Sequence, residues 1–239
     1  MKAMILAAGL GTRMRPLTLA VPKPLLKIAD KALIEYHLER LVAAGISELV
    51  INVSYLGQQI MDALGDGKRF NAKIAYSIEA QPLETAGGIV NALPILGGEP
   101  FLCISSDIWT DYSFKHGVWD RLPEFSEKRL AHLVLVDNPE HHPKGDFCLM
   151  RKGKRAPFGQ LVQDLVSNGS REPCDTLTYS GISLLNPALF DDCDVTVGRL
   201  APLLKLAMAK NWVSGEYYQG EWSDIGTPER LLQIKQQLE

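Results

Sequence analysis

A loop rich in glycine and positive charge follows the first apolar stretch of the chain. Glycine lets backbone N–H groups approach a ligand closely, and guanidinium and ammonium groups supply positive charge for several phosphates. A nucleoside triphosphate is the first ligand to test, while a glycine turn followed by a solvated basic loop accounts for the spacing equally well. The glycines and cations of the loop are Gly9, Gly11, Arg13, Arg15 and Lys23.

Two better-known glycine motifs do not fit this loop. A dinucleotide-binding loop needs glycine or alanine where this chain has Met14, and it continues into a long helix, which Pro16, Pro22 and Pro24 prevent. A P-loop ends in Gly-Lys-Ser/Thr, and this loop does not. We therefore do not expect a nicotinamide cofactor.

Two acidic residues are placed where they would face such a loop. Asp107 ends the segment Ser105-Ser106-Asp107 after an apolar run, and Asp224 lies just before Thr227-Pro228. Ligands of open α/β sheets bind at the carboxyl ends of the strands, so Asp107 should reach the same cleft as the glycine loop. Capping of a following helix is the alternative role for each acid. If both face a polyphosphate, they suit a Mg²⁺ ion that is bound mainly through phosphate oxygens.

Short apolar runs rich in β-branched residues predict the strands that would position these groups. Helical patterns alternate with them: one begins at Leu33 and ends before Gly45, a second covers residues 58–64, and a third begins at a Thr85 cap. This alternation predicts a doubly wound sheet. The apolar runs cover residues 3–7, 48–53, 73–78, 101–105 and 131–136.

The pattern changes after residue 136. Strand candidates at 146–151, 160–166 and 177–185 follow one another with only turns between them, which predicts antiparallel pairing. The basic run at 151–155 fits a hairpin tip. The remaining expected elements are a helix at 198–210, an extended segment at 211–219 and a closing helix at 227–238 with Thr227 as its cap.

The bulk properties are those of a globular protein. The 239 residues are 46% hydrophobic and 22% charged, which suits one large α/β domain. The net charge of -3 argues against a nucleic-acid-binding surface, and no apolar run is long enough to cross a bilayer. Without a signal-peptide pattern, we expect a cytoplasmic protein with no nucleic-acid or membrane partner, as a monomer or small homo-oligomer.

The cysteines and histidines show no metal-binding pattern. Cys103, Cys148, Cys174 and Cys193 lack Cys-x-x-Cys spacing, so buried thiols are expected rather than zinc ligands or disulfides. The adjacent histidines at 141–142 would point in opposite directions on an extended chain. A structural or substrate-proximal loop is expected there.

Four motifs follow one another in an order that spans essentially the whole chain. They are Gly9-Leu10-Gly11-Thr12-Arg13-Met14-Arg15-Pro16, Pro22-Lys23-Pro24-Leu25, Asp107 after a strand, and Trp222-x-Asp224-x-Gly226-Thr227. This combination resembles the sugar-1-phosphate nucleotidylyltransferase family. The resemblance implies that a sugar 1-phosphate and a nucleoside triphosphate are joined with release of pyrophosphate.

The same resemblance implies a fold. It is a Rossmann-like nucleotidyltransferase fold of the α/β class, with a mixed, mostly parallel sheet, helices on both faces and a small antiparallel sugar-binding portion. One domain would cover residues 1–239. Within it, residues 1–136 would form the nucleotide-binding part, and residues 137–239 the sugar-binding part and closing helix.

Roles for individual residues are also implied by the resemblance. Arg13 with the loop amides would hold the β- and γ-phosphates, and Lys23 would bridge the sugar phosphate and the α-phosphate, so both would be catalytic. No side-chain nucleophile is needed, because the sugar phosphate is the attacking group. Glu79 would contact uracil or guanine, and Glu84 stands where relatives usually have glycine. The implied sets are Ala8, Gly9, Gly11, Thr12, Arg13, Lys23, Glu79, Gly88 and Ser106 for the nucleotide, Gly145, Asp146, Ser180, Gly181 and Arg199 for the sugar, and Asp107 and Asp224 for Mg²⁺.

Further segments resemble the branch of this family that uses UTP and N-acetylmuramate 1-phosphate in peptidoglycan recycling. The lactyl carboxylate of that sugar needs an additional cation, for which Arg199, Lys144 and Lys205 are candidates. Mannose-1-phosphate guanylyltransferases and glucose-1-phosphate uridylyl- or thymidylyltransferases stay as alternatives. A non-catalytic sugar-nucleotide sensor is another, although the implied catalytic and metal-binding residues are all present. The segments cover residues 107–112, 136–142, 145–147 and 200–204.

Overall fold

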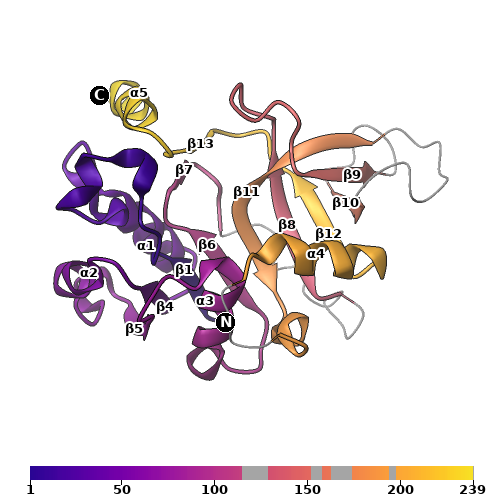
Figure 1. The fold of residues 1–239 in the computed structure, drawn as a ribbon, viewed down its shortest axis with the longest axis horizontal. Coiled ribbons are helices and arrows are strands. Elements are labelled where there is room, and N and C mark those ends of the chain that lie inside the picture. Colours follow the sequence, from indigo (N-terminus) through magenta and orange to yellow (C-terminus); the bar gives the residue numbers. More distant parts are fainter. Residues whose placement is uncertain (115–128, 152–157, 163–173, 194–197, 239) are drawn as a thin grey trace.

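A mixed sheet forms the centre of the computed structural model, which describes residues 1–114, 129–151, 158–162, 174–193 and 198–238. In this part of the chain the sheet has nine strands in the order β5-β4-β1-β6-β11-β8-β12-β10-β9 (Figure 1). All of them except β10 and β11 point in the same direction. The strands are β1 (Ala3–Leu6), β4 (Glu48–Val53), β5 (Lys73–Ile78), β6 (Phe101–Ser105), β8 (Ala131–Val136), β9 (Phe147–Arg151), β10 (Phe158–Val162), β11 (Asp175–Leu185) and β12 (Val213–Tyr217).

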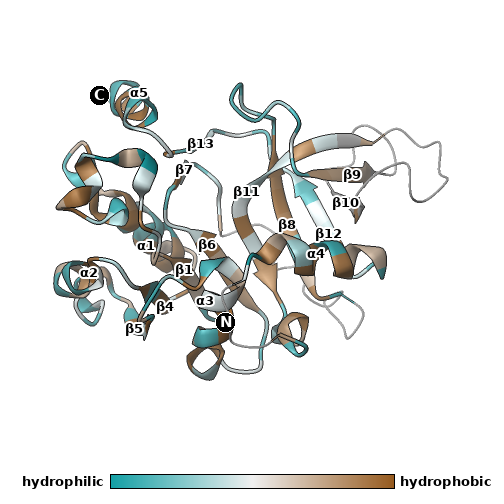
Figure 2. Ribbon diagram, viewed as in Figure 1, coloured by the Kyte–Doolittle hydropathy of each residue, from teal (hydrophilic) through white to brown (hydrophobic). Residues whose placement is uncertain are grey.

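Helices cover both faces of this sheet because its central strands are apolar on both sides. In β1, Ala3 and Ile5 pack in one core cluster with α1 and α2, whereas Met4 packs on the other face with α3 and α4. Hydrophilic and hydrophobic residues share helices α4 and α5 in Figure 2, as expected of helices that bury one side. The helices are α1 (Leu33–Ala43), α2 (Gly57–Leu64), α3 (Glu84–Leu96), α4 (Leu200–Ala209) and α5 (Pro228–Leu238).

Most of the expected helix boundaries are confirmed. Gly45 follows α1 with a left-handed φ of 84°. The Thr227 hydroxyl oxygen accepts the N–H of Arg230 at 3.4 Å and so caps α5. None of the helices in the described ranges is long and apolar enough to cross a membrane.

The start of α3 differs from the expectation. The helix begins at Glu84, and Thr85 does not cap it. The carbonyl of Gly198 instead accepts the N–H groups of Ala86 at 2.8 Å and Gly87 at 3.3 Å. Because a residue distant in sequence satisfies these first-turn donors, the helix needs no side-chain cap.

The C-terminal strands do not form a simple series of hairpins. β9 and β10 make the expected antiparallel pair, but β11 lies between β6 and β8, antiparallel to both, and also pairs with β9. β12, in the segment expected to be extended, runs parallel to β8. The strand expected at 160–166 is described only to Val162, and residues 152–155 of the basic run lie outside the described residues.

The expectation of free thiols is wrong for one cysteine pair. Cys148 in β9 and Cys174, just before β11, form a disulfide, with their Cα atoms 5.6 Å apart. The register between β9 and β11 places Thr176 opposite Cys148 and so brings Cys174 alongside. The spacing of cysteines in the sequence could not show this pairing, because it depends on which strands are neighbours. Cys103 is a buried thiol, as expected.

Two short antiparallel ladders were not predicted from the sequence, because each strand has only two or three residues and leaves no periodic pattern. β2 (Lys27–Ile28) pairs with β3 (Lys31–Ala32), which closes the turn after the glycine-rich loop. β7 (Ile108–Thr110) pairs with β13 (Trp222–Asp224), and the register places Asp224 opposite Ile108. The second ladder therefore joins two distant motifs.

Candidate active site

Two adjoining cavities lie at the carboxyl ends of β1 and β6. The first cavity, about 640 Å³, is lined by the glycine-rich loop, Lys23, Glu79 and Ser106. The second cavity, about 570 Å³, is lined by residues of β11, β13 and the loop after β8. Arg13 and Asp107 line both. The sheet therefore brings most of the residues expected for the nucleotide, the sugar and the metal to two adjoining cavities.

The glycine-rich loop is held by buried side chains rather than by a following helix. Met14 is fully buried and packs with Ile28 and Ile225. The hydroxyl of Thr18 donates to the carbonyl of Gly11 at 2.8 Å, and Gly11 has a φ of 61°, which favours glycine. The buried Met14 side chain and the Thr18 hydroxyl thus hold the loop in place.

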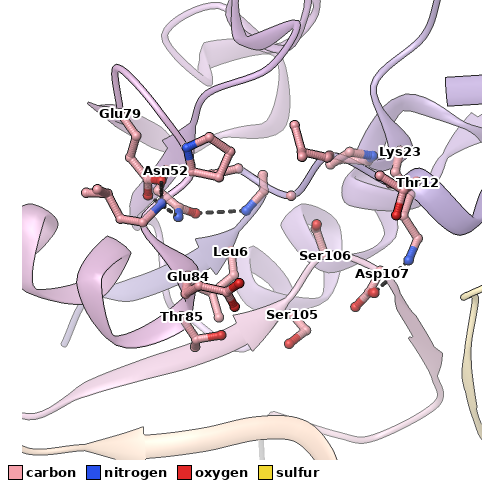
Figure 3. A pocket seen from close by; sticks show the side chains of 18 of the residues that line it. Leu6, Thr12, Lys23, Asn52, Glu79, Glu84, Thr85, Ser105, Ser106 and Asp107 are labelled. Atoms are coloured by element: carbon pink, nitrogen blue, oxygen red, sulfur yellow. Dashed lines mark hydrogen bonds and ion pairs between the residues drawn. The ribbon is translucent and has the colours of Figure 1, made fainter. Parts of the chain in front are cut away.

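Lys23 and Asp107 meet at one end of the first cavity. The Lys23 Nζ lies 2.6 Å from Asp107 Oδ2, and the Lys23 side chain is only 11% exposed. In Figure 3 this ion pair lies on one side of the cavity, and Asn52 with Glu79 lies on the other. One end of the cavity therefore carries an ion pair, Lys23 with Asp107. The other end carries an amide hydrogen-bonded to a carboxylate, Asn52 with Glu79.

Asp224 reaches the site through the β7–β13 ladder. Ile225 donates its N–H to the carbonyl of Asp107 at 2.7 Å, so the two acids lie on adjacent segments. Asp224 lines the second cavity beside Asp107. Its Oδ1 lies 2.5 Å from the Arg230 guanidinium and 3.0 Å from His141 Nε2. Each acid thus has a basic partner.

A buried histidine supports the segment that carries Asp107. Burial in α1 lowers the pKa of His37 from its usual 6.5 to about 4, with Arg40 as a smaller cause, so the ring is neutral at pH 7. Its Nε2 lies 3.0 Å from the carbonyl of Ile108. A neutral ring must carry its proton on Nε2 to donate to that carbonyl. His37 therefore fixes β7 directly after Asp107.

The wall of the second cavity is shaped by a bulge in β11. The register with β8 shifts between Tyr179 and Ser183, and Gly181 adopts a φ of 85°. Ser180 donates from its hydroxyl to the Val134 carbonyl at 2.7 Å and accepts the Trp222 indole N–H at its own carbonyl at 2.8 Å. Ser180 and Gly181 both line this cavity.

Asp146 lines the same cavity, whereas Gly145 does not. Gly145 has a φ of 62°, and a Cβ there would lie 2.6 Å from Asn138 Oδ1. Its glycine is therefore needed for the turn that presents Asp146. The Asp146 carboxylate accepts the Tyr179 N–H at 2.9 Å and lies 3.1 Å from His142 Nε2.

Comparison with known proteins gives the family. The sequence profile described as nucleotidyl transferase matches residues 2–239. The chain belongs to the nucleotidyl transferase family. The N-acetylmuramate alpha-1-phosphate uridylyltransferase of Neisseria meningitidis serogroup B is 48% identical over 98% of this chain and 97% of that protein.

A more distant relative and a solved structure are also similar to this chain. The mannose-1-phosphate guanyltransferase of Yarrowia lipolytica is 31% identical over 97% of this chain, which spans 62% of that longer protein. The structure of UDP-glucose pyrophosphorylase complexed with UDP-glucose superposes with a TM-score of 0.75 at 18% identity, covering 99% of this chain and 97% of that one. The expected Rossmann-like nucleotidyltransferase fold is thus confirmed.

Nucleotidyl transferases of this family generally use a divalent metal ion, and the donor set here fits one. In the described parts of the chain, no group of three His, Cys, Asp or Glu side chains could hold a metal. Asp107, which lines both cavities, and Asp224, which lines the second, offer carboxylate oxygens. A hard divalent cation can complete its coordination with phosphate and water oxygens.

Asn52 lines the first cavity, and sequence reasoning missed it. Its Oδ1 accepts the Ala7 N–H at 2.8 Å, and its Nδ2 donates to Glu79 Oε1 at 2.7 Å. Glu79 is 4% exposed, and its Oε2 accepts the Leu83 N–H at 3.0 Å. The signal available was a single amide side chain inside the apolar run 48–53.

Gly88 does not line the first cavity, although it was expected to contact the nucleotide. It lies in α3 beneath the Asn52–Glu79 pair, where an added Cβ would be 2.7 Å from Glu79 Oε1 and 2.8 Å from Asn52 Nδ2. Its glycine therefore lets α3 approach that pair. Arg15 is exposed and lines neither cavity.

Gly9 lines the first cavity, and a Cβ there would have no protein atom within 4 Å. Neither packing nor a left-handed φ requires glycine at this position. If glycine is required there, the reason would be the close approach of a bound ligand. We expect Gly9→Ala to raise the KM for the nucleoside triphosphate about tenfold, because forcing a methyl group into a close contact costs roughly 1–3 kcal/mol. The melting temperature should not fall.

Gly98→Ala is the matched control for this prediction. A Cβ at Gly98 also meets no atom within 4 Å, but this residue lines neither cavity. Steady-state kinetics with varied nucleotide and thermal melting should separate the two variants. An unchanged KM in Gly9→Ala would remove Gly9 from the nucleotide contact.

Proposed function

We propose that this protein transfers a uridylyl group from UTP to N-acetylmuramate 1-phosphate, giving UDP-N-acetylmuramate and pyrophosphate in peptidoglycan recycling. The observation that carries the proposal is the 48% identity, over nearly the full length of both chains, with the N-acetylmuramate alpha-1-phosphate uridylyltransferase. The 31% identical guanyltransferase is a weaker match over only part of its own length. The two adjoining cavities agree with a reaction between two phosphorylated substrates.

In this proposal the nucleoside triphosphate occupies the first cavity. Its base lies at the end formed by Asn52 and Glu79, and its phosphates lie along the glycine-rich loop towards Lys23. Arg13 and the loop amides hold the β- and γ-phosphates. The sugar of the second substrate lies against Asp146, Ser180 and Gly181 in the second cavity, with its phosphate at the junction.

The chemical step needs alignment and charge stabilisation rather than a protein nucleophile. A phosphate oxygen of the sugar 1-phosphate forms a bond to the α-phosphorus of UTP, and the bond from that phosphorus to the bridging oxygen of pyrophosphate breaks. The flexible stem of Lys23 allows its ammonium to move from Asp107 to the phosphates of both substrates. Asp107 and Asp224 would hold Mg²⁺, which would neutralise charge on the α-phosphate.

Arg199 is the best placed of the three candidate cations for the lactyl carboxylate. It lines both cavities, whereas Lys144 and Lys205 line neither. We expect Arg199→Met to lower kcat/KM for N-acetylmuramate 1-phosphate about tenfold and to leave N-acetylglucosamine 1-phosphate almost unchanged. Tenfold is the lower end for a charge-assisted hydrogen bond, roughly 1.5 kcal/mol, and suits a side chain that is 80% exposed.

Lys205→Met in α4, the helix that Arg199 directly precedes, is the control for Arg199→Met. Competition between the two sugar phosphates in one reaction would measure the preference directly. If the preference for N-acetylmuramate 1-phosphate does not change in Arg199→Met, Arg199 does not recognise the carboxylate.

A substrate panel tests the proposed function itself. The purified protein would be given UTP, GTP, dTTP and ATP in combination with the 1-phosphates of N-acetylmuramate, N-acetylglucosamine, glucose and mannose, and pyrophosphate release would be measured. We expect the highest kcat/KM with UTP and N-acetylmuramate 1-phosphate. Turnover with mannose 1-phosphate and GTP alone would contradict the proposed uridylyl transfer to N-acetylmuramate 1-phosphate. Binding of UTP with no turnover in any combination would favour a non-catalytic sugar-nucleotide sensor.

A further inference from the structure

The basic partners of the two site carboxylates differ in whether they border a cavity. Lys23, the partner of Asp107, is an unbranched side chain that lines the first cavity and is needed at the phosphates in the proposed function. Arg230, the partner of Asp224, lines neither cavity and belongs to the first turn of α5. Of these two cations, only Lys23 is placed to move from its carboxylate partner to a bound substrate.

The Arg230 guanidinium is enclosed by the protein. Its side chain is 13% exposed, and NH1 lies 2.5 Å from Asp224 Oδ1 and 2.6 Å from His141 Nε2. A Cβ at position 226 would overlap the guanidinium, so Gly226 provides the space that it fills. Asp224, Gly226 and Arg230 therefore form one packed unit.

The helix that carries Arg230 is anchored to the site. Leu231 and Ile234 of α5 are buried in a cluster with Met14, Trp109 and Ile225. Met14 belongs to the glycine-rich loop and Ile225 follows Asp224 directly. Figure 1 shows α5 leading out of β13. The backbone on both sides of the ion pair is thus fixed by buried packing.

The ion pair leaves one oxygen of Asp224 available. In the described part of the chain, Oδ1 contacts Arg230 and His141, while Oδ2 accepts no hydrogen bond. A carboxylate with a single bound oxygen has one preferred orientation, and its second oxygen then has a defined direction. Partners that orient a metal ligand in this way typically change metal affinity or activity by about 10- to 100-fold when removed.

We propose that Arg230 is a positioning residue for Asp224, which holds Oδ1 so that Oδ2 is directed to the divalent cation. The inference rests on the proposed role of Asp224 as a metal ligand. Arg230 also adds positive charge close to the ion, which by itself would weaken metal binding. Orientation outweighs this repulsion, because a carboxylate that loses its partner can rotate away from the ion.

The experiment measures metal binding apart from turnover. Mn²⁺ would be titrated into the protein saturated with UTP, without sugar phosphate, and followed by electron paramagnetic resonance. We expect Arg230→Met to weaken Mn²⁺ binding about tenfold or more. Arg230→Lys keeps the charge beside Oδ1, and its Mn²⁺ affinity should stay within about threefold of the parent protein.

Lys235→Met is the matched control, because it removes one positive charge from the same helix without touching Asp224. It should leave Mn²⁺ binding unchanged. Melting temperatures of all variants would be measured in parallel. If Arg230→Met does not fold, Arg230→Gln serves as the neutral variant with the same expectation.

Asp224→Asn separates the inference from the function on which it rests. If Asp224→Asn binds Mn²⁺ as well as the parent protein does, Asp224 is not a metal ligand and the premise fails. If Asp224→Asn weakens binding and Arg230→Met does not, Arg230 has only a structural role and the inference alone fails. Equal losses in folded Arg230→Met and Arg230→Lys would also overturn it, because a cationic donor at Oδ1 would then have no effect on the direction of Oδ2.

Discussion

Replacing Lys23 by methionine is expected to lower kcat by about 100- to 1,000-fold, the usual cost of losing one donor that stabilises transition-state charge. The Lys23 ammonium lies 2.6 Å from Asp107 and borders the first cavity, so it is placed to reach the reacting phosphates. Methionine keeps the length of the side chain and removes the charge. The loss should appear in kcat, because Lys23 stabilises charge that increases in the transition state.

The effect on folding should be small. A single ion pair of which one partner is 37% exposed contributes at most about 1 kcal/mol to the free energy of unfolding. Lys27→Met is the control, because Lys27 is an exposed lysine four positions further along that lines neither cavity. Pyrophosphate release and thermal melting would be measured for both. Near-normal kcat in Lys23→Met would show that this ammonium has no part in the chemistry.

The second large effect is expected for Asp107→Asn. Asparagine keeps the shape of the side chain but loses the charge that would hold Mg²⁺ beside Asp224. We expect kcat/KM at a fixed Mg²⁺ concentration to fall about 100-fold, and the Mg²⁺ concentration for half-maximal rate to rise. Additional Mg²⁺ should recover part of the rate of Asp107→Asn, whereas the rate of Lys23→Met should not respond.

Asp111→Asn provides the comparison for Asp107→Asn. Asp111 lies four positions further on, is exposed and lines neither cavity, so its loss of charge should leave the Mg²⁺ dependence unaltered. Pyrophosphate release over a range of Mg²⁺ concentrations is the measurement. Intact release in Asp107→Asn would mean that the assignment of this acid as a metal ligand is wrong.

Much of the fold could be predicted because buried strands and amphipathic helices leave local patterns. The runs at 48–53 and 73–78 coincide with β4 and β5, and helix α1 ends before Gly45 as the pattern indicates. The position of β11 could not be predicted in this way. Its apolar residues suit any buried strand, and its place between β6 and β8 depends on pairing with segments distant in sequence.

The candidate site shows the same division. Lys23, Asp107 and Asp224 belong to motifs that are recognisable in the sequence, and the structure brings them to adjoining cavities. Asn52 and Arg230 were missed, because one lies inside an apolar strand and the other in a helix that reads as an ordinary amphipathic segment. Asn52 contacts residues far from it in the sequence, and Arg230 contacts Asp224 across a turn. A local sequence pattern does not predict such contacts.

The sequence by itself determined the family, the alternation of strands and helices, and the residue types available for a polyphosphate and a metal, since these follow from motifs and hydrophobic periodicity. Only the tertiary structure decided how the charges are shared. The β7–β13 ladder places Asp224 beside Asp107, and the fold pairs Asp107 with Lys23 and Asp224 with Arg230. Of these two cations, Lys23 lines the first cavity, whereas Arg230 lines neither. Charge sharing of this kind depends on distances of a few ångströms between segments that meet only after folding.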